Sequence, residues 1–404
     1  MFRNLPVGLL FLAVFLTQPL EVFAQAKNYG PGVSDNEIKL GQTMPYSGPV
    51  SALSALGKAE LAYFDMLNAS GGVKGRKIKL ISLDDGYNPA KTVEQTRALV
   101  ENENVLALFS SLGGATNGAI HKYVNDKKIP HLFIASNLMR WADPEHFPWT
   151  IQSIRAPFYL EGQVYARYIL RVHPKAKIAI LYFHEDTAKD YLAGFKSVLG
   201  DKAASMIVSE ATHDFNDPTV DSQIVTLKAS GADTLLTLAG PKHAAMAIRK
   251  VYDIGWRPLQ IVPFFASSIG AVLKPAGLEK SIGLISSAVA KDPSDPQWRD
   301  DPAVKDYLAW ARTWYPNGDP MAWDNVVGYS KGQLMAEMLR RCDDDLTREN
   351  LLRQATHIKH LQLPMMLPGI TIDLSPSDYL PIEQVQLIRF DGKQWVRFGE
   401  IEGR

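Results

Sequence analysis

Cysteine is almost absent: the chain of 404 residues has only Cys342. A single thiol excludes an internal disulfide, and no cysteine lies near the N-terminus to accept a lipid. A cluster of cysteine zinc ligands is excluded for the same reason, and no H-E-x-x-H pattern occurs. We therefore expect no metal site and no bound cofactor.

The sequence also lacks an excess of charge of one sign. Lysine and arginine number 43, aspartate and glutamate also number 43, and no long run of like charge occurs. A surface without a dominant sign does not attract polyanions. Neither nucleic acid nor an acidic membrane surface is therefore an expected partner.

Long apolar runs are scarce as well. The N-terminus reads MFRNLPVGLLFLAVFLTQPLEVFAQA, where Arg3 precedes an apolar stretch at 7–15 and Ala24 and Ala26 form an A-x-A pattern. This layout predicts a cleaved secretory signal peptide over residues 1–26, because a membrane anchor needs about 20 apolar residues. An exported chain without disulfide or lipid suits a bacterial periplasm.

What the sequence does contain is enough apolar surface, at 46% of residues, for more than one core. From Glu37 onward short apolar runs alternate with helical patterns, and the rhythm begins again after Arg155. Such alternation predicts two successive α/β units with parallel strands. Near the C-terminus, VQLIRF-DGK-QWVRF predicts a hairpin that turns at Asp391 and Gly392.

The loop FSSLGGATNG follows the apolar run VLAL. Its glycines let backbone amides approach a ligand, and the helix that follows favours an anionic or carbonyl oxygen. The loop matches neither the P-loop pattern nor G-x-G-x-x-G, so a nucleotide site is not indicated. A plain turn with Thr116 or Asn117 as helix cap fits the spacing equally well.

The stretch GYSKG at 328–332 matches the G-x-S-x-G pattern of a hydrolase nucleophile elbow. An acid at Asp343–Asp345 and a histidine at His357 or His360 would fit the chain order. The apolar residues on both sides of Ser330, however, continue a helical periodicity, which favours one uninterrupted helix. A secreted α/β hydrolase that uses Ser330 remains the alternative function.

Six stretches occur in a fixed order along the chain: PYSGP (45–49), LNASGGVKGRKIKLISLDD (67–85), SLGGATN (111–117), KIPHLF (128–133), KDYLAGF (189–195) and IGAVLKPAGLE (269–279). Together they resemble the solute-binding proteins of ABC importers, in the type I periplasmic branch called the branched-chain amino-acid-binding or leucine-binding family. The resemblance covers residues 37 to 398.

The resemblance implies an α/β fold of two Rossmann-like lobes joined by three crossovers, with the ligand in the cleft between them. The expected lobes are 37–154 with 287–362 and 155–286 with 363–404. It further implies a monomer without catalytic activity that hands a small solute to ABC importer permease subunits in the inner membrane. The same fold also serves stand-alone ligand sensors, which is a second alternative.

The resemblance places the following residues at the ligand site: Tyr46, Ser47, Leu112, Gly113, Gly114, Ala135, Ser136, Arg155, Thr187, Gly240, Phe264 and Phe265. Amino-acid binders of the family use an acidic residue for the ammonium group where this chain has Phe264 or Phe265. Arg155 could pair with a carboxylate. These differences predict an aromatic or branched organic acid rather than an amino acid as the solute.

Overall fold

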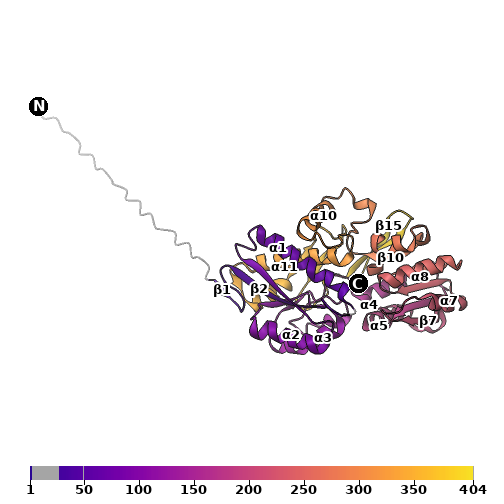
Figure 1. Ribbon diagram of the computed structural model, residues 1–404, viewed down its shortest axis with the longest axis horizontal. Helices are drawn as coiled ribbons and strands as arrows, with labels where there is room; N and C mark the ends of the chain where they lie inside the picture. The colour runs from indigo at the N-terminus through magenta and orange to yellow at the C-terminus, as the bar shows by residue number, and fades with distance from the viewer. Residues whose placement is uncertain (2–26, 49, 404) are drawn as a thin grey trace.

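The structure is a computed structural model that describes residue 1, residues 27–48 and residues 50–403. Within these residues the main strands form two sheets, each flanked by helices (Figure 1). The sheets belong to two lobes joined by three crossings of the chain, which confirms the expected α/β fold. The predicted signal peptide lies, apart from residue 1, outside the described residues.

The first lobe is built on four parallel strands of the described chain, in the order β3-β2-β4-β5. The strands are β2 (Glu37–Met44), β3 (Lys77–Asp84), β4 (Ala107–Phe109) and β5 (His131–Leu132). Its helices are α1 (Ala55–Ala69), α2 (Pro89–Arg97), α3 (Gly114–Asp126), α10 (Pro302–Trp314), α11 (Trp323–Cys342) and α12 (Arg348–Ala355). Because α11 packs along α1, distant parts of the chain share one core (Figure 1).

The second lobe has seven strands among the described residues, in the order β15-β14-β10-β9-β8-β6-β7. Five are parallel: β6 (Ile178–Phe183), β7 (Ile207–His213), β8 (Thr234–Leu238), β9 (Leu259–Ile261) and β10 (Ile285–Ala288). The helices are α4 (Phe158–Val172), α5 (Asp186–Leu199), α6 (Ala203–Met206), α7 (Asp221–Ala229), α8 (Pro241–Asp253) and α9 (Lys274–Ala276).

The predicted C-terminal hairpin is confirmed as β14 (Gln384–Phe390) and β15 (Trp395–Gly403), which pair antiparallel. The Asp391 side chain accepts hydrogen bonds from the amides of Lys393 and Gln394. Gly392 has a φ of 104°, a left-handed value that favours glycine.

The chain crosses between the lobes after β5, after β10 and after α12. The described chain also has two small sheets: β1 (Asn28–Tyr29) pairs with β11 (Asp345–Leu346) at the outer end of the first lobe (Figure 1), and β12 (Ile358–Leu361) pairs with β13 (Ile372–Leu374). The lobe boundaries expected from the sequence, 37–154 with 287–362 and 155–286 with 363–404, remain a prediction.

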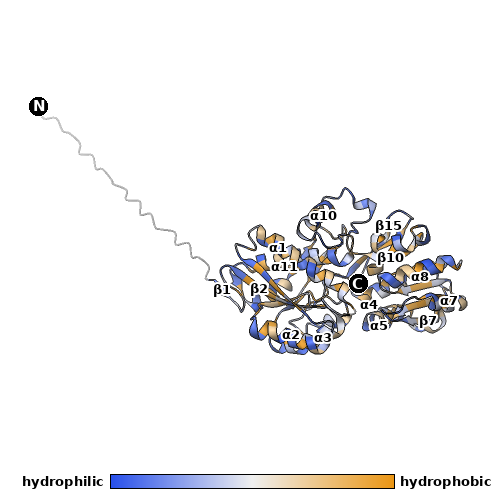
Figure 2. Ribbon diagram, viewed as in Figure 1, coloured by the Kyte–Doolittle hydropathy of each residue, from blue (hydrophilic) through white to orange (hydrophobic). Residues whose placement is uncertain are grey.

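The central parallel strands are buried because helices cover both faces of each sheet. Every residue of β4 and of β8 is buried, as expected for strands covered on both sides. Helices such as α8 have a hydrophobic side and a hydrophilic side (Figure 2). The carboxyl ends of the parallel strands carry the segments that face the other lobe, which is where open α/β sheets bind ligands.

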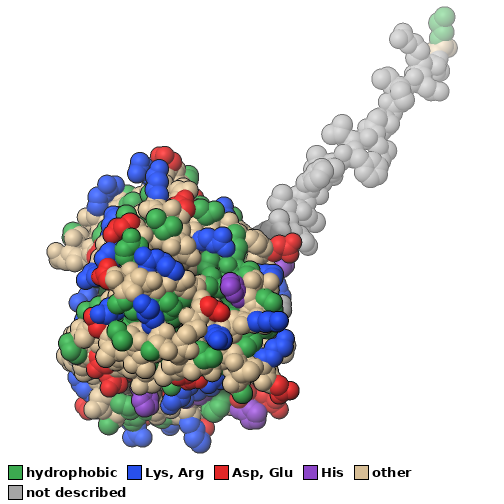
Figure 3. All heavy atoms as spheres, turned by 90° about the vertical axis from the view of Figure 1, so that its right-hand side faces the viewer, with side chains coloured by type: hydrophobic (Ala, Val, Ile, Leu, Met, Phe, Trp, Pro, Cys, Tyr) green, Lys and Arg blue, Asp and Glu red, His purple; other side chains and the backbone are tan. Residues whose placement is uncertain are grey.

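None of the described helices is long and apolar enough to cross a membrane. On the face shown in Figure 3, basic and acidic side chains are interspersed, without a large patch of one sign.

The G-x-S-x-G stretch is part of a continuous helix, not of a strand–turn–helix elbow. α11 runs through it, and the buried Ser330 hydroxyl donates to the Val326 carbonyl at 2.8 Å. A Cβ on Gly328 would lie 2.6 Å from the Leu56 carbonyl oxygen, and one on Gly332 would overlap the Tyr63 ring. The glycines therefore allow α11 to approach α1 closely. Ser330, buried in this helix, does not have the geometry of the nucleophile that the hydrolase alternative requires.

Candidate ligand site between the lobes

Two loops of the first lobe follow the ends of β4 and β5: the 112–114 loop and the 135–136 segment. Leu112 and Ala135 form a β-bridge, and the Gly113 amide donates to the Ala135 carbonyl at 3.2 Å. The Leu112 amide donates to Thr43 and the Ala135 amide to Ser111. These three amides are therefore used inside the lobe, although sequence reasoning expected these loops to offer main-chain donors to a solute.

Tyr87, which sequence reasoning missed, shapes the same loop. It has a φ of 60°, rare for a bulky residue, and its amide donates to Asp85 Oδ1 at 2.9 Å. Gly113 has a φ of 111°, and a Cβ there would lie only 2.5 Å from the Tyr87 ring. The Gly114 amide is a hydrogen-bond partner of the Tyr87 hydroxyl, and burial raises the pKa of Tyr87 to about 12.

The hydroxyl residues of this lobe have protein partners. The Tyr46 hydroxyl lies 2.7 Å from Ser82 Oγ. The Ser47 amide and hydroxyl donate to Asp84 at 3.0 and 2.6 Å. Ser136 is buried and accepts from the indole of Trp141 at 2.9 Å.

Aromatic rings cover the facing edge of the second lobe. They come from the start of α4, the ends of β6 and β7, the helix α5 and the turn after β9: Phe158, Phe183, Tyr191, Phe215, Phe264 and Phe265. Phe265 is half-buried, with its ring centre 6.4 Å from that of Phe183 and 6.2 Å from that of Tyr191. Phe215 is 41% exposed, and a Cβ on Gly240 would lie 3.7 Å from its ring. We call these six rings the aromatic cluster.

A buried carboxylate holds the aromatic turn in place. Glu161 on α4 accepts from the Phe264 amide at 2.9 Å and from the Ser287 hydroxyl at 2.6 Å. The hydroxyls of Tyr165 and Tyr191 also donate to it. Burial raises the pKa of Glu161, and the four donors oppose that shift in part. Glu161 therefore fixes the backbone of the turn that carries Phe264 and Phe265.

Arg155 and Trp323 join the lobes at the first crossing and at the start of α11. The Arg155 guanidinium donates to Asp324 Oδ1 at 2.9 Å and lies 5.8 Å from the ring centre of Phe264. The rings of Trp323 and Phe264 are 5.9 Å apart. Arg155 Nε and Trp323 Nε1 are buried without a hydrogen-bond partner in the described part of the chain.

Charged residues of the first crossing and of the second lobe approach one another beside the 112–114 loop. Arg140, on the first crossing, donates to the Gly114 carbonyl at 3.1 Å and lies 3.6 Å from Asp186. Glu185, just before α5, is half-buried, and burial raises its pKa. Thr187 lies in the first turn of α5 beside these two acids.

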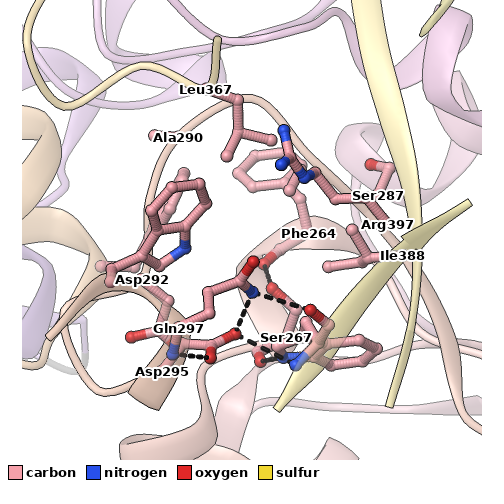
Figure 4. A pocket seen from close by; sticks show the side chains of 14 residues that line it. Phe264, Ser267, Ser287, Ala290, Asp292, Asp295, Gln297, Leu367, Ile388 and Arg397 are labelled. Carbon is pink, nitrogen blue, oxygen red and sulfur yellow. Dashed lines mark hydrogen bonds between the residues drawn. The ribbon is translucent and has the colours of Figure 1, made fainter. Parts of the chain in front are cut away.

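A small cavity lies on the hinge side of Phe264 (Figure 4). Its volume is about 30 Å³, enough for one or two waters. Asp295 in its wall accepts from the Gln297 amide and from the Trp395 amide, both at 3.0 Å. Of the residues expected at the ligand site, only Phe264 lines this cavity, so it is separate from the facing loops.

The predicted residues are thus distributed over two facing surfaces. Those of the first lobe are Tyr46, Ser47, Leu112, Gly113, Gly114, Ala135 and Ser136, and those of the second are Thr187, Gly240, Phe264 and Phe265, with Arg155 between them. Sequence reasoning missed Tyr87, Trp323 and most of the aromatic cluster. Whether the predicted residues bind a solute remains a prediction.

Curated proteins resemble somewhat more than half of the chain. The curated relatives include Leu/Ile/Val-binding protein homolog 7 of Brucella abortus (strain 2308), 24% identical over 253 residues, which are 58% of this chain and 60% of that protein. Homolog 8 from the same strain is 23% identical over 56% of this chain and 57% of its own length. The chain therefore matches about three fifths of the length of these relatives.

Solved structures share the fold. A branched-chain amino acid ABC transporter protein from Thermus thermophilus with bound valine superposes with a TM-score of 0.81 at 15% identity, over 92% of this chain and 98% of that one. A fatty acid ABC transporter substrate-binding protein from Thermomonospora curvata gives 0.71 at 22% identity, over 94% and 95%. The sequence profile described as "Periplasmic binding protein" matches residues 37–394. The chain therefore belongs to the periplasmic binding protein family.

Proposed function

We propose that the protein binds a small organic acid between its lobes, outside the cytoplasm, and delivers it to the permease of an ABC importer. The favoured solute has an aromatic or branched body and a carboxylate, and lacks an ammonium group. The single observation that carries this proposal is the aromatic cluster, which occupies the edge of the second lobe where a solute would meet it.

The aromatic cluster favours an apolar body. Phe265 is half-buried and Phe215 partly exposed, so both rings retain surface that a solute can cover. Rings at 4.5–7 Å with tilted or edge-on geometry form favourable aromatic contacts, and the cluster already has this spacing. A flat or branched hydrocarbon can continue the same packing.

The charges at the site disfavour an ammonium group. Asp186 is already paired with Lys189 at 3.1 Å and lies near Arg140. Glu185 has a raised pKa because it is partly buried, and ionised Asp186 raises it further. An ammonium ion buried without an ionised partner costs several kcal/mol. Glu185 is a candidate partner on this surface if an amino acid binds.

A carboxylate has a partner in Arg155. Its guanidinium already bonds Asp324, but the Nε donor is unused among the described residues. A solute carboxylate could share the guanidinium through the second edge of the planar group. The names of the fold relatives do not decide the solute class, since one refers to fatty acid and another to bound valine.

A thermal-shift screen with two matched pairs tests the solute class. Leucine and 4-methylpentanoate differ only in the ammonium group, and so do phenylalanine and 3-phenylpropanoate. A solute that binds only the folded state raises the midpoint of unfolding. We expect both acids to raise it more than their amino acids at equal concentration; the reverse order in both pairs would contradict the proposal.

Delivery needs a separate experiment. Capture of the exported protein by permease-containing membranes of its own cell, increased by the bound acid, is the expected result. Binding of the acid without any membrane capture would favour a stand-alone sensor instead.

A further inference from the structure

Lys331 lies in the middle of α11 and is completely buried, at 0% exposure. Its ammonium group donates to Ser110 Oγ at 2.9 Å and to the Phe133 carbonyl oxygen at 2.7 Å. A buried lysine with no role is rare, because removing its charge from water is costly. Its two contacts show which part of the fold the buried charge holds.

Ser110 directly follows β4 and Phe133 directly follows β5. Both have left-handed backbones, with φ values of 56° and 53°, where the Cβ of a residue other than glycine is crowded. Such conformations persist only where the surroundings hold them, and they gather at functional sites. One ammonium group contacts both.

These two residues lead into the loops that face the second lobe. Ser110 lies two residues before the start of the 112–114 loop, and Phe133 lies two residues before the start of the 135–136 segment. The β-bridge between Leu112 and Ala135 joins the loops just beyond the lysine. A change at Lys331 is therefore transmitted to both loops together.

We propose that Lys331 is a positioning residue whose ammonium group holds the turns at Ser110 and Phe133, so that loss of its proton loosens both loops and weakens solute binding. The effect on solute binding rests on the proposed function, whereas the effect on the loops does not. Hydrogen bonds from a charged donor are stronger than those from a neutral one, which is why protonation matters.

The surroundings of Lys331 place its titration in the neutral range. Burial lowers the pKa of Lys331 to about 7, and burial raises the pKa of its neighbour Glu60, on α1, to about 7. Glu60 favours the ammonium form, Asp324 on α11 favours it too, and Arg155 on the first crossing disfavours it. His131 on β5 also faces this charge, and burial keeps it neutral by lowering its pKa to about 3.

The direction of the pH effect follows from these groups. Below about pH 7 Lys331 carries its proton and the loops are held. As the pH rises through this value the proton is lost, the two hydrogen bonds weaken and the loops loosen. Replacing Glu60 by glutamine removes a charge that favours the ammonium form, so Glu60→Gln moves the transition to lower pH.

Hydrogen–deuterium exchange of the solute-free protein, followed on peptides that cover 110–114 and 133–136, tests the proposal directly. After correction for intrinsic rates, the wild type should exchange these amides about tenfold faster at pH 9 than at pH 6. Lys331→Met should exchange rapidly at both values, and Glu60→Gln should shift the midpoint downward. The double variant Glu60→Gln/Lys331→Met, which leaves no lone buried charge, serves if the single variant fails to fold.

Arg348→Met is the matched control. Arg348 donates to the carbonyls of Val105 and Leu106, at the opposite end of the same strand from Ser110. We expect it to leave exchange at 110–114 and 133–136 unchanged. A wild type without pH dependence at these peptides, or a control that loosens them equally, would overturn the proposal.

The effect of Lys331 on affinity is tested with 3-phenylpropanoate. Its dissociation constant should rise about tenfold in the double variant, whereas Arg348→Met should retain the wild-type value. If the acid does not bind the wild type, the proposed function fails and the exchange result still decides the role of Lys331. Binding of the acid with equal affinity by wild type and double variant would refute the link between the loops and the solute.

Discussion

Arg155 and Asp324 form an ion pair of 2.9 Å that ties the first crossing of the chain to the first turn of α11. The two side chains are 16% and 30% exposed, so the pair is shielded from water in part. It lies beside Phe264 and Trp323, where the two lobes meet. The pair therefore both stabilises the hinge and positions the Arg155 guanidinium, the charge proposed to bind a solute carboxylate.

Asp324→Asn should lower the free energy of unfolding by about 1–2 kcal/mol, because it leaves a partly buried guanidinium without its counter-ion. Urea unfolding measures the change. The control is Lys122→Met, which breaks the exposed pair with Asp126 and should change stability by less than about 0.5 kcal/mol. Equal effects of both substitutions would show that the Arg155 pair is not special.

Phe265→Ala should weaken the binding of 3-phenylpropanoate by about 1–3 kcal/mol, since the half-buried ring is placed to stack on the solute. Phe398→Ala is the matched control, because Phe398 is also half-buried in the second lobe but packs on Tyr168. Calorimetry that finds the same affinity for wild type and Phe265→Ala would exclude this ring from the site.

His131 predicts an acid-sensitive fold. The residue is fully buried, and neither ring nitrogen has a hydrogen-bond partner in the described residues. Burial lowers its pKa to about 3, so between about pH 3 and 6.5 the unfolded chain binds a proton that the folded protein does not. Stability therefore falls as the pH drops below about 6.5.

His131→Leu should remove part of this loss, with a gain of about 1–2 kcal/mol over the wild type between pH 6.5 and 5. The exposed His184 offers the control, and His184→Gln should leave the slope of stability against pH unchanged. A His131→Leu variant with the wild-type slope would contradict the assignment.

Closure of the lobes should accompany binding, because a solute that contacts both facing surfaces favours the state in which they are closer. Small-angle scattering at saturating 3-phenylpropanoate should show a smaller radius of gyration than the solute-free protein. Saturation without compaction would mean that the solute contacts one lobe alone.

The sequence predicted the architecture because the evidence for it is local. The alternation of short apolar runs and helical patterns, the Asp391–Gly392 turn and the helix through Ser330 all follow from neighbouring residues. The glycines around Ser330, in contrast, have a tertiary cause, since Gly328 and Gly332 face α1, which is distant in the sequence. Periodicity was therefore a better guide than the motif.

The site was less predictable because it is assembled by the order of the strands. Phe158, Phe183 and Phe215 lie far apart in the sequence and join one cluster through Phe265, because α4 begins, and β6 and β7 end, at one edge of the second sheet. The use of the Leu112 and Ala135 amides inside the lobe likewise depends on the bridge between two loops. Neither pattern has a signal within a short stretch of sequence.

Lys331 did have a signal. It lies four residues after Val327 and three before Leu334, which places a charged side chain on the apolar face of α11. A charge at such a position means either that the apolar face of the helix is wrongly predicted or that the charged group is buried with hydrogen-bond partners. The structure supplies the partners, Ser110 and Phe133.

The most direct test of the central claim is titration calorimetry of the wild-type protein with 4-methylpentanoate and with leucine. The two compounds differ only in the ammonium group; of the acids at the facing surfaces, Asp186 is paired with Lys189, and burial raises the pKa of Glu185. The account predicts that the acid binds at least about tenfold more tightly. A higher affinity for leucine, lost in Glu185→Gln, would contradict it and identify Glu185 as the ammonium partner.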